Sequence, residues 1–185
     1  MEYATVELLY PNVLAKHVVI KGSSGFLHPD ITVYAFTTIE ETCTVGSKVV
    51  IGSNVFVGRG SFIGEGTRIQ HGVFICRYTH IGKNVFIGPC VVLADDKHPR
   101  VNNSEYDAQA PFLDDECSIG AGVVILPGVH IGKRAIVGAG AVVTHNVPDG
   151  ATVVGIPAVP VTTSVTTQTM TGKAVITNFE GFGIL

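Results

Sequence analysis

Charged residues are scarce in this chain, and what it lacks excludes several classes of protein. Only 15% of its 185 residues are charged, tryptophan is absent, and the formal net charge is −3. There is no basic stripe, so nucleic acid is a poor candidate partner. No apolar run approaches the roughly 18 residues that a membrane span needs. The N-terminus MEYATVELLYPN lacks the basic segment of a secretory signal. We therefore expect a cytoplasmic chain without a membrane partner.

Cysteine is also sparse, and its spacing fits neither a zinc site nor a redox motif. The four cysteines are Cys43, Cys76, Cys90 and Cys117. No two of them are separated by the two residues of a CxxC motif. We expect four free thiols in a reducing cytoplasm and no bound metal.

The branched aliphatic residues of this chain recur with a period of six. Neither the 3.6-residue period of a helix nor the two-residue period of an isolated strand explains this spacing. It is typical of a hexapeptide β-helix. The branched aliphatic residues of the repeat are Val33, Ile39, Val45, Ile51, Val57, Ile63, Ile69, Ile75, Ile81, Ile87 and Leu93, then Ile119, Ile125, Ile131, Val137 and Val143.

Each hexad reads as a short strand followed by a sharp corner. Three residues after the aliphatic site stands a glycine or asparagine in most hexads, as at Asn54, Gly72 and Gly140. These residue types enter positive φ at the lowest cost. Tyr78 and Cys90 are exceptions at that corner. Three hexads should close one triangular coil, so residues 18 apart should stack in an all-β parallel β-helix built from hexapeptide repeats.

The repeat divides the chain into three parts. Residues 1–30 lack the hexad and should form an irregular N-terminal cap, and residues 31–158 should form the β-helix. One long loop, 94–118, interrupts the repeat, and a long excursion from a regular scaffold is usually functional. Residues 159–185 are rich in threonine and should form an extended C-terminal segment.

Some outward-facing positions of the predicted coils carry large apolar side chains. Phe56, Phe74 and Val92 are 18 residues apart and should share one face. A stacked apolar row on a surface usually marks an interface. The row therefore predicts a homo-oligomer.

Three segments resemble a known family. They are IGSNVFVGRGSFIGEGTRIQHGVFI, IGKNVFIGPCVVLADDKHPR and IGAGVVILPGVHIGKRAIVGAGAVVTHNVPDGATVVGIPA. They resemble the left-handed β-helix acyltransferases of the hexapeptide superfamily. Within it, they are most similar to N-acetyltransferases that act on nucleotide-linked amino sugars. The resemblance implies a left-handed coil, a homotrimer, acetyl-CoA or another acyl-CoA as co-substrate, and active sites between subunits.

The resemblance also assigns the CoA site. It implies that the pantetheine arm lies along the later coils near Gly138, Ala139 and Gly140. It places the adenine end near the turn GIPA, and so near Ile156 and Pro157. Members of the family often continue that turn with a lysine, whereas Val159 stands here.

Acyl transfer to an amine needs a group that removes the amine proton and donors for the developing oxyanion. Histidine suits the proton step, and His71 and His98 are the two catalytic candidates. His71 is in the segment IQHGV, where the similar amino-sugar enzymes tend to have asparagine in a rung that lines the active site. His98 precedes a proline in the loop, as a catalytic histidine does in related O-acetyltransferases. The 18-residue spacing places the two at different corners, so a cleft between subunits would have to bring them together.

Three further loop residues are candidate substrate ligands. Asp95 and Asp96 take the place of the Asn-Asp of the family pattern and could orient a histidine or bind the sugar. Arg100 could bind a nucleotide phosphate through two hydrogen bonds. The alternative for each is an exposed residue of a surface loop. His80 and His130 are expected to be surface or interface residues.

Three other functions compete with N-acylation. O-acetylation of a sugar or another small hydroxyl compound is favoured if His98 is the base. A carbonic anhydrase of the same fold would need three histidine ligands from neighbouring rungs, and here Ser53 and Cys76 stand where two of them would be. A non-catalytic hexapeptide scaffold would need neither histidine and would not bind CoA.

Overall fold

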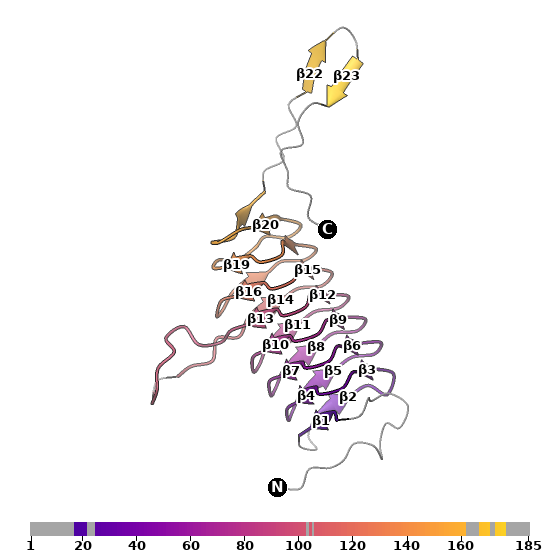
Figure 1. The fold of residues 1–185 in the computed structure, drawn as a ribbon, viewed down its shortest axis with the longest axis vertical. Helices are drawn as coiled ribbons and strands as arrows, with labels where there is room; N and C mark the ends of the chain where they lie inside the picture. Colours follow the sequence, from indigo (N-terminus) through magenta and orange to yellow (C-terminus); the bar gives the residue numbers. More distant parts are fainter. Residues whose placement is uncertain are drawn as a thin grey trace.

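The protein is a parallel β-solenoid with three faces, drawn in Figure 1. The computed structural model describes residues 17–21, 25–102, 104, 106–161, 167–170 and 173–176. Within those residues the chain forms short strands and turns and no helix, so the described part has no helix that could cross a membrane. The predicted all-β hexapeptide fold is confirmed.

The first face is a seven-stranded sheet. In spatial order its strands are β1 (Val19–Ile20), β4 (Thr38–Ile39), β7 (Phe56–Val57), β10 (Phe74–Ile75), β13 (Val92–Leu93), β16 (Val124–Ile125) and β19 (Val142–Val143). All of them pair in parallel with their neighbours.

The second and third faces are sheets of six and eight strands. The second contains β2 (Phe26–Leu27), β5 (Thr44–Val45), β8 (Phe62–Ile63), β11 (His80–Ile81), β14 (Phe112–Leu113) and β17 (His130–Ile131). The third contains β3 (Thr32–Val33), β6 (Val50–Ile51), β9 (Arg68–Ile69), β12 (Phe86–Ile87), β15 (Ser118–Ile119), β18 (Ile136–Val137), β20 (Thr152–Val154) and β21 (Val159–Pro160).

The predicted register of 18 residues is present. Phe56 pairs with Phe74, and Phe74 with Val92. The second residue of each two-residue strand from β3 to β19 points inward and is buried, and the first points outward, which is the strand alternation that the hexad requires. The inward residues form the core, with Ile39, Ile63 and Ile87 fully buried. Each contributes on the order of 1.5–3 kcal/mol through burial.

The corners use the left-handed backbone conformation that glycine and asparagine predicted. Gly72 and Gly140 have φ near +70°, and Asn54 has φ of +57°. The exceptions Tyr78 and Cys90 adopt the same conformation, with φ of +59° and +58°. A side chain at positive φ costs free energy, so these two residues carry backbone strain that a glycine would not.

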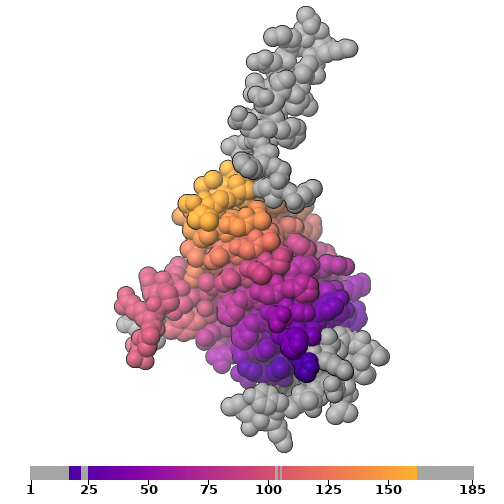
Figure 2. All heavy atoms as spheres, viewed as in Figure 1, coloured from indigo at the N-terminus to yellow at the C-terminus, as the bar shows by residue number. Residues whose placement is uncertain are grey.

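The loop is shorter than the predicted span of 94–118. Phe112 and Leu113 form β14, in which Leu113 is fully buried. Phe112 pairs with His80, which is 32 residues earlier rather than 18. The hexad therefore resumes one repeat before Ile119. Leu113 was missed because no regular hexad precedes it. The loop joins β13 to β14 and projects away from the solenoid, as the pink segment in Figures 1 and 2 shows.

The coils begin earlier than the predicted boundary at residue 31. Within residues 1–30, β1 already pairs with β4, and β2 with β5. Residues 1–16 and 22–24 of the expected cap lie outside the described part. At the other end β21 turns back antiparallel on β20. In the expected C-terminal segment, β22 (Thr167–Met170) pairs antiparallel with β23 (Lys173–Ile176), and the rest beyond Val161 is outside the described part.

Candidate active site

Stacking the coils brings the predicted residues into two separate columns. The corner between the third and first faces, which we call the His71 corner, holds His71, Gly138 to Gly140 and the turn with Ile156 and Pro157. The corner between the first and second faces, the loop corner, holds the loop with Asp95, Asp96, His98 and Arg100. His71 and His98 therefore lie at different corners of one chain, as the 18-residue spacing predicts.

The His71 corner is held together by a ladder of backbone hydrogen bonds. Gly72 N–H donates to Ser53 O at 2.9 Å, and Cys90 N–H donates to His71 O at 2.9 Å. Gly52 allows the next coil to approach this closely, because a Cβ there would come within 2.7 Å of the His71 nitrogen. The backbone of His71 is thus fixed from the coils below and above it.

The ring of His71 is held as well. Its Nδ1 accepts the backbone N–H of Ser53, one coil below, at 2.9 Å. The edge of the ring meets the ring of Tyr34, with centroids 6.2 Å apart and planes at 71°. His71 is exposed, so the structure shows an oriented ring at the surface.

Above His71 the corner becomes a strip of small residues. Ala121, Gly122, Ala139 and Gly140 are all exposed, and a Cβ added at Gly122 or Gly140 would meet nothing within 4 Å. The N–H groups of Gly122 and Gly140 donate to Pro89 O and Ala121 O within the ladder. The N–H groups of Ala121 and Ala139 have no acceptor among the described residues. The strip therefore contains two backbone donors without an acceptor among the described residues, both in exposed residues.

The predicted CoA residues differ in what they offer a ligand. Gly138 is buried, and its N–H donates to Val153 O at 2.8 Å, so it shapes the corner. Ala139 and Gly140 are exposed. Ile156 exposes 75% of its surface in the turn that ends the column, next to an exposed Pro157. Ala158 N–H and Gly155 O bond Val142 of the first face, which places this turn over the same corner.

At the loop corner, Asp95 anchors the base of the loop. Its Oδ2 accepts the Tyr106 hydroxyl at 2.6 Å and lies 3.5 Å from Arg77 Nε. The Arg77 guanidinium lies 4.8 Å from the centre of the Tyr106 ring. Burial and the Asp95 carboxylate raise the pKa of the Tyr106 hydroxyl to about 12, so it stays a donor. Asp95 was predicted as a substrate ligand, but in this structure its carboxylate joins the loop to the coil.

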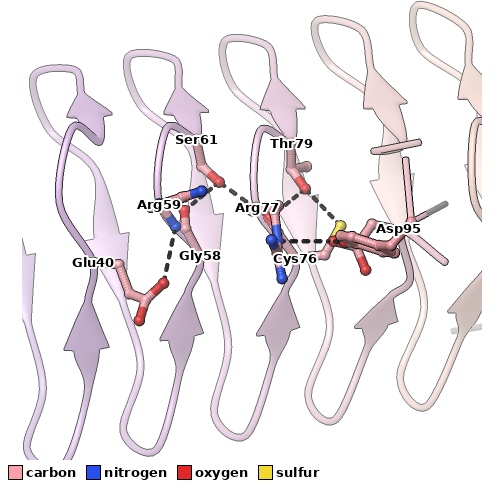
Figure 3. A network of polar contacts seen from close by, with 9 residues as sticks. Glu40, Gly58, Arg59, Ser61, Cys76, Arg77, Thr79 and Asp95 are labelled. Carbon is pink, nitrogen blue, oxygen red and sulfur yellow. Dashed lines mark hydrogen bonds and ion pairs between the residues drawn. The ribbon is translucent and has the colours of Figure 1, made fainter. Parts of the chain in front are cut away.

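Figure 3 shows the hydrogen bonds that the buried hydroxyl groups make inside the loop corner. Ser61 Oγ donates to Gly58 O at 2.7 Å, and Thr79 Oγ1 donates to Cys76 O at 2.8 Å. These hydroxyls occupy hexad positions that elsewhere carry valine, and they are buried. A buried hydroxyl needs a hydrogen bond to offset its desolvation. Both therefore make this corner rigid directly below the loop.

The outer loop residues are free to meet a ligand. Asp96 Oδ1 accepts the backbone N–H of His98 at 2.8 Å, which orders the turn. The side chains of His98 and Arg100 are exposed and have no partner among the described residues. The loop also carries Val101, 91% exposed. An apolar side chain presented to solvent beside an imidazole and a guanidinium suits contact with another molecule.

The second face carries a stack of rings that the sequence did not predict. The His80 ring lies between Phe62, at 4.8 Å, and Phe112, at 4.2 Å, with planes within 10°. His130 meets the edge of Phe112, and its Nε2 lies 2.7 Å from Asp114 Oδ2. His80 was expected to be a surface or interface residue, whereas it is half-buried in this stack. The faces of its ring are taken by phenylalanine.

We predict that His80 makes the protein less stable in acid. Burial lowers the pKa of His80, although Asp114 and Asp115 oppose that shift. The unfolded chain therefore takes up a proton near pH 6.5 while the folded chain resists it, and stability falls as pH drops from 6.5 through the lowered pKa. His80→Phe should keep the stack and remove this part of the loss. Urea unfolding of both proteins at pH 7.5, 6.5 and 5.5 measures it, and equal acid losses would contradict the prediction.

The described residues contain no group of three or more histidine, cysteine, aspartate or glutamate side chains placed to hold a metal ion. Cys43, Cys76 and Cys117 are buried and free, and Cys90 is exposed.

The chain matches the bacterial transferase hexapeptide family (six repeats) over residues 60–95 and 111–145. These two ranges are the coils on either side of the loop. The chain is a hexapeptide-repeat protein. The match covers the strands and corners from β8 to β13 and from β14 to β19, and most of the loop between the two ranges lies outside it.

Relatives of this hexapeptide-repeat protein are acetyltransferases. It is 48% identical over 77 residues to a 2,3,4,5-tetrahydropyridine-2,6-dicarboxylate N-acetyltransferase of Staphylococcus aureus, covering 42% of this chain and 30% of that protein. It is 35% identical over 82 residues to a galactoside O-acetyltransferase of Lactococcus lactis, covering 42% and 39%. The chain thus matches less than half the length of either relative.

Among solved structures, the hexapeptide-repeat protein is similar to a perosamine N-acetyltransferase from Caulobacter crescentus in complex with CoA and GDP-perosamine. The TM-score is 0.56 and the identity 25%, covering 79% of this chain and 57% of that one. Sequence reasoning found the His71 corner through its family resemblance. It missed the two unpaired N–H groups and the bond from Ser53, because both depend on which atoms face each other between coils.

Proposed function

We propose that this protein is an acyl-CoA-dependent acyltransferase that transfers an acetyl group to the amino group of a nucleotide-linked amino sugar. The observation that carries the proposal is the His71 corner. An oriented histidine lies there at one end of a strip of small residues with two unpaired backbone donors, Ala121 and Ala139. We place the enzyme in the cytoplasm on the basis of its acyl-CoA substrate.

The strip suits the pantetheine arm of acyl-CoA. Pantetheine is a thin chain with two amide groups, and its carbonyl oxygens accept hydrogen bonds. Ala121 and Ala139 offer N–H groups one coil apart, about 4.7–4.9 Å. The missing side chains at Gly122 and Gly140 leave open space beside them. The exposed Ile156 and Pro157 at the end of the column would contact the adenine end. The C. crescentus structure contains CoA, which supports this co-substrate.

A homotrimer is part of the proposal, because one chain does not bring its two histidines together. The outward residues of the first face are apolar or threonine, and the Phe56 and Phe74 rings stack at 5.2 Å. Phe74 and Val92 are 44% and 37% exposed. Packing this face against a second copy would bury it. The loop projects away from its own solenoid (Figure 2) and would reach the His71 corner of a neighbour.

In such a cleft the loop would supply the acceptor site. His98 would meet the amine or hydroxyl of the sugar, and Asp96 beside it would bind sugar hydroxyls. Arg100 would pair with a nucleotide phosphate. Asp95 would act mainly by holding the loop against Arg77 and Tyr106. The bound GDP-perosamine in the C. crescentus structure supports a nucleotide-linked amino sugar as the acceptor class.

O-acetylation is the second candidate, and the freedom of the His98 side chain favours it. A histidine with no internal partner is available as a base for a hydroxyl group, and one relative is a galactoside O-acetyltransferase. Only the acceptor differs between the two candidates. A third outcome, a scaffold without catalysis, would leave the strip without a ligand.

We predict that wild-type protein releases CoA from acetyl-CoA when given a nucleotide-linked amino sugar. Thiol release should be measured over a panel of nucleotide-linked amino sugars and their hydroxy counterparts. His98→Ala should lower turnover by about 10²–10⁴-fold, the range that loss of a general base gives. Turnover with hydroxy acceptors alone would move the assignment to O-acetylation. No turnover and no CoA binding by calorimetry would contradict both and support the scaffold.

A further inference from the structure

The hydrogen bond between Ser53 and His71 decides which nitrogen of His71 carries its proton. The backbone N–H of Ser53 can only donate, so Nδ1 of His71 must accept. A neutral imidazole with an accepting Nδ1 has its proton on Nε2. The outward nitrogen of the neutral ring is therefore a donor and has no lone pair to receive a proton.

The same contact recurs elsewhere in the solenoid with aspartate in place of histidine. Asp115 Oδ1 accepts Lys83 N–H at 2.8 Å, and Asp149 Oδ1 accepts Lys133 N–H at 3.0 Å. In each case a side chain at the third hexad position accepts the N–H of the third position one coil below. A carboxylate has only acceptors when ionised. A side chain that contacts this N–H must therefore accept from it, and Nδ1 of His71 takes the place that a carboxylate oxygen takes in the two aspartate contacts.

We propose that His71 acts as a hydrogen-bond donor through Nε2–H to the thioester carbonyl oxygen as negative charge develops there, and does not act as the base. This inference rests on the proposed acyltransferase function. The amine nitrogen of the sugar forms the new C–N bond to the carbonyl carbon of the thioester, and the C–S bond breaks. The amine loses one proton to another group, and the departing CoA thiolate takes one up. His71 keeps its proton throughout.

A donor at this place has the properties that oxyanion stabilisation needs. Such donors work when they are already oriented before charge develops. The His71 ring is oriented by Ser53 on one side and by Tyr34 on another, on a corner fixed by backbone bonds. To serve as a base, the ring would have to move its proton to Nδ1. The Nδ1–H of His71 and the backbone N–H of Ser53 would then face each other, and neither could accept a hydrogen bond. Proton removal then belongs to another group, for which His98 is the available histidine.

The first test reads the tautomer directly. Imidazole ¹⁵N chemical shifts should be measured on the full-length protein with labelled histidine at pH 7.5, with His71 assigned by the loss of its signals in His71→Asn. We expect the Nε2–H form. Ser53→Pro should shift His71 toward a mixture of tautomers, because it removes the N–H. The coil accepts proline at this hexad position, since Gly88-Pro89 stands one coil above Gln70-His71. A wild-type Nδ1–H form would overturn the inference.

The second test separates donor from base by substitution. Asparagine can accept from Ser53 and donate outward, aspartate can only accept, and alanine does neither. A donor role predicts that His71→Asn stays within about tenfold of wild-type kcat. His71→Asp and His71→Ala should lose about 10²–10³-fold, as removal of an oxyanion donor does. If His71→Asn is as inactive as His71→Asp while the wild type turns over, the donor role of His71 is refuted and the proposed acyltransferase function still stands. If the wild type does not turn over with any acceptor of the panel, the proposed function fails and the inference with it.

Discussion

Alkylation of Cys90 is expected to abolish acyl transfer. Cys90 lies in the His71 corner one coil above His71, and its N–H donates to His71 O at 2.9 Å. A Cβ added at Gly72 would come within 3.4 Å of its Sγ. A maleimide adduct on this sulfur would stand between His71 and the strip at Ala121, where the thioester must pass. We expect a loss of more than about 10²-fold in turnover, which corresponds to roughly 2.7 kcal/mol of activation free energy.

The other three thiols should not react at a comparable rate, so the effect can be assigned to Cys90. Burial raises the pKa of Cys43, that of Cys76 to about 11 and that of Cys117 to about 12. Only the thiolate is nucleophilic, so buried thiols with raised pKa values are nearly inert. Mass spectrometry of the folded protein after brief N-ethylmaleimide treatment should find a single adduct at Cys90.

Two controls make the alkylation experiment decisive. Cys90→Gly should keep turnover within about threefold and resist N-ethylmaleimide. Glycine already stands at this corner position at Gly72, Gly122 and Gly140, and it adopts at a lower cost the φ of +58° that Cys90 has. Prior binding of CoA should protect the wild-type thiol. Full activity of the Cys90 adduct would show that acyl-CoA does not lie along the His71 corner. The proposed function would then need another site.

The fold was predictable because one local rule is repeated. Each hexad specifies an inward aliphatic residue and a corner at positive φ, and three hexads specify the stacking of residues 18 apart, so the sequence contains the register of every coil. The rule fails where the repeat is interrupted. Leu113 is a correct hexad residue, but the aspartates beside it and the irregular loop before it concealed β14.

The sequence could predict which corner of the solenoid His71 and His98 occupy, but not which atoms contact each other there. The 18-residue spacing separates His71 from His98. The column of Ala139 follows only once β14 is counted, because it adds one hexad between Leu93 and Ile119. The spacing does not specify that the His71 ring turns its Nδ1 toward Ser53, or that Asp95 pairs with Tyr106. Those contacts depend on side-chain rotamers and on the path of an irregular loop. The acceptor pocket depends further on the docking of copies, which the repeat of one chain does not describe.

Ile63→Asp is expected to unfold several coils, whereas the same change one residue earlier should be tolerated. Ile63 is fully buried in β8 and pairs with Val45 below and Ile81 above. The substitution removes about 1.5–3 kcal/mol of burial and adds several kcal/mol for an unpaired buried carboxylate. Phe62, 38% exposed on the same strand, points outward. Phe62→Asp should cost only about 1 kcal/mol, the scale of a lost ring pair.

The comparison of these two variants tests the register itself, because a shift of one residue would exchange their effects. Thermal unfolding followed by circular dichroism should show Ile63→Asp with part of its strand signal lost at 25 °C, and Phe62→Asp close to wild type. Coils contact mainly their neighbours, so the loss should spread from β8 to β5 and β11 and leave distant coils folded. Hydrogen exchange should therefore remain slow at β18 and become fast at Ile81. An unchanged melting curve for Ile63→Asp would refute the inward assignment of the hexad aliphatics.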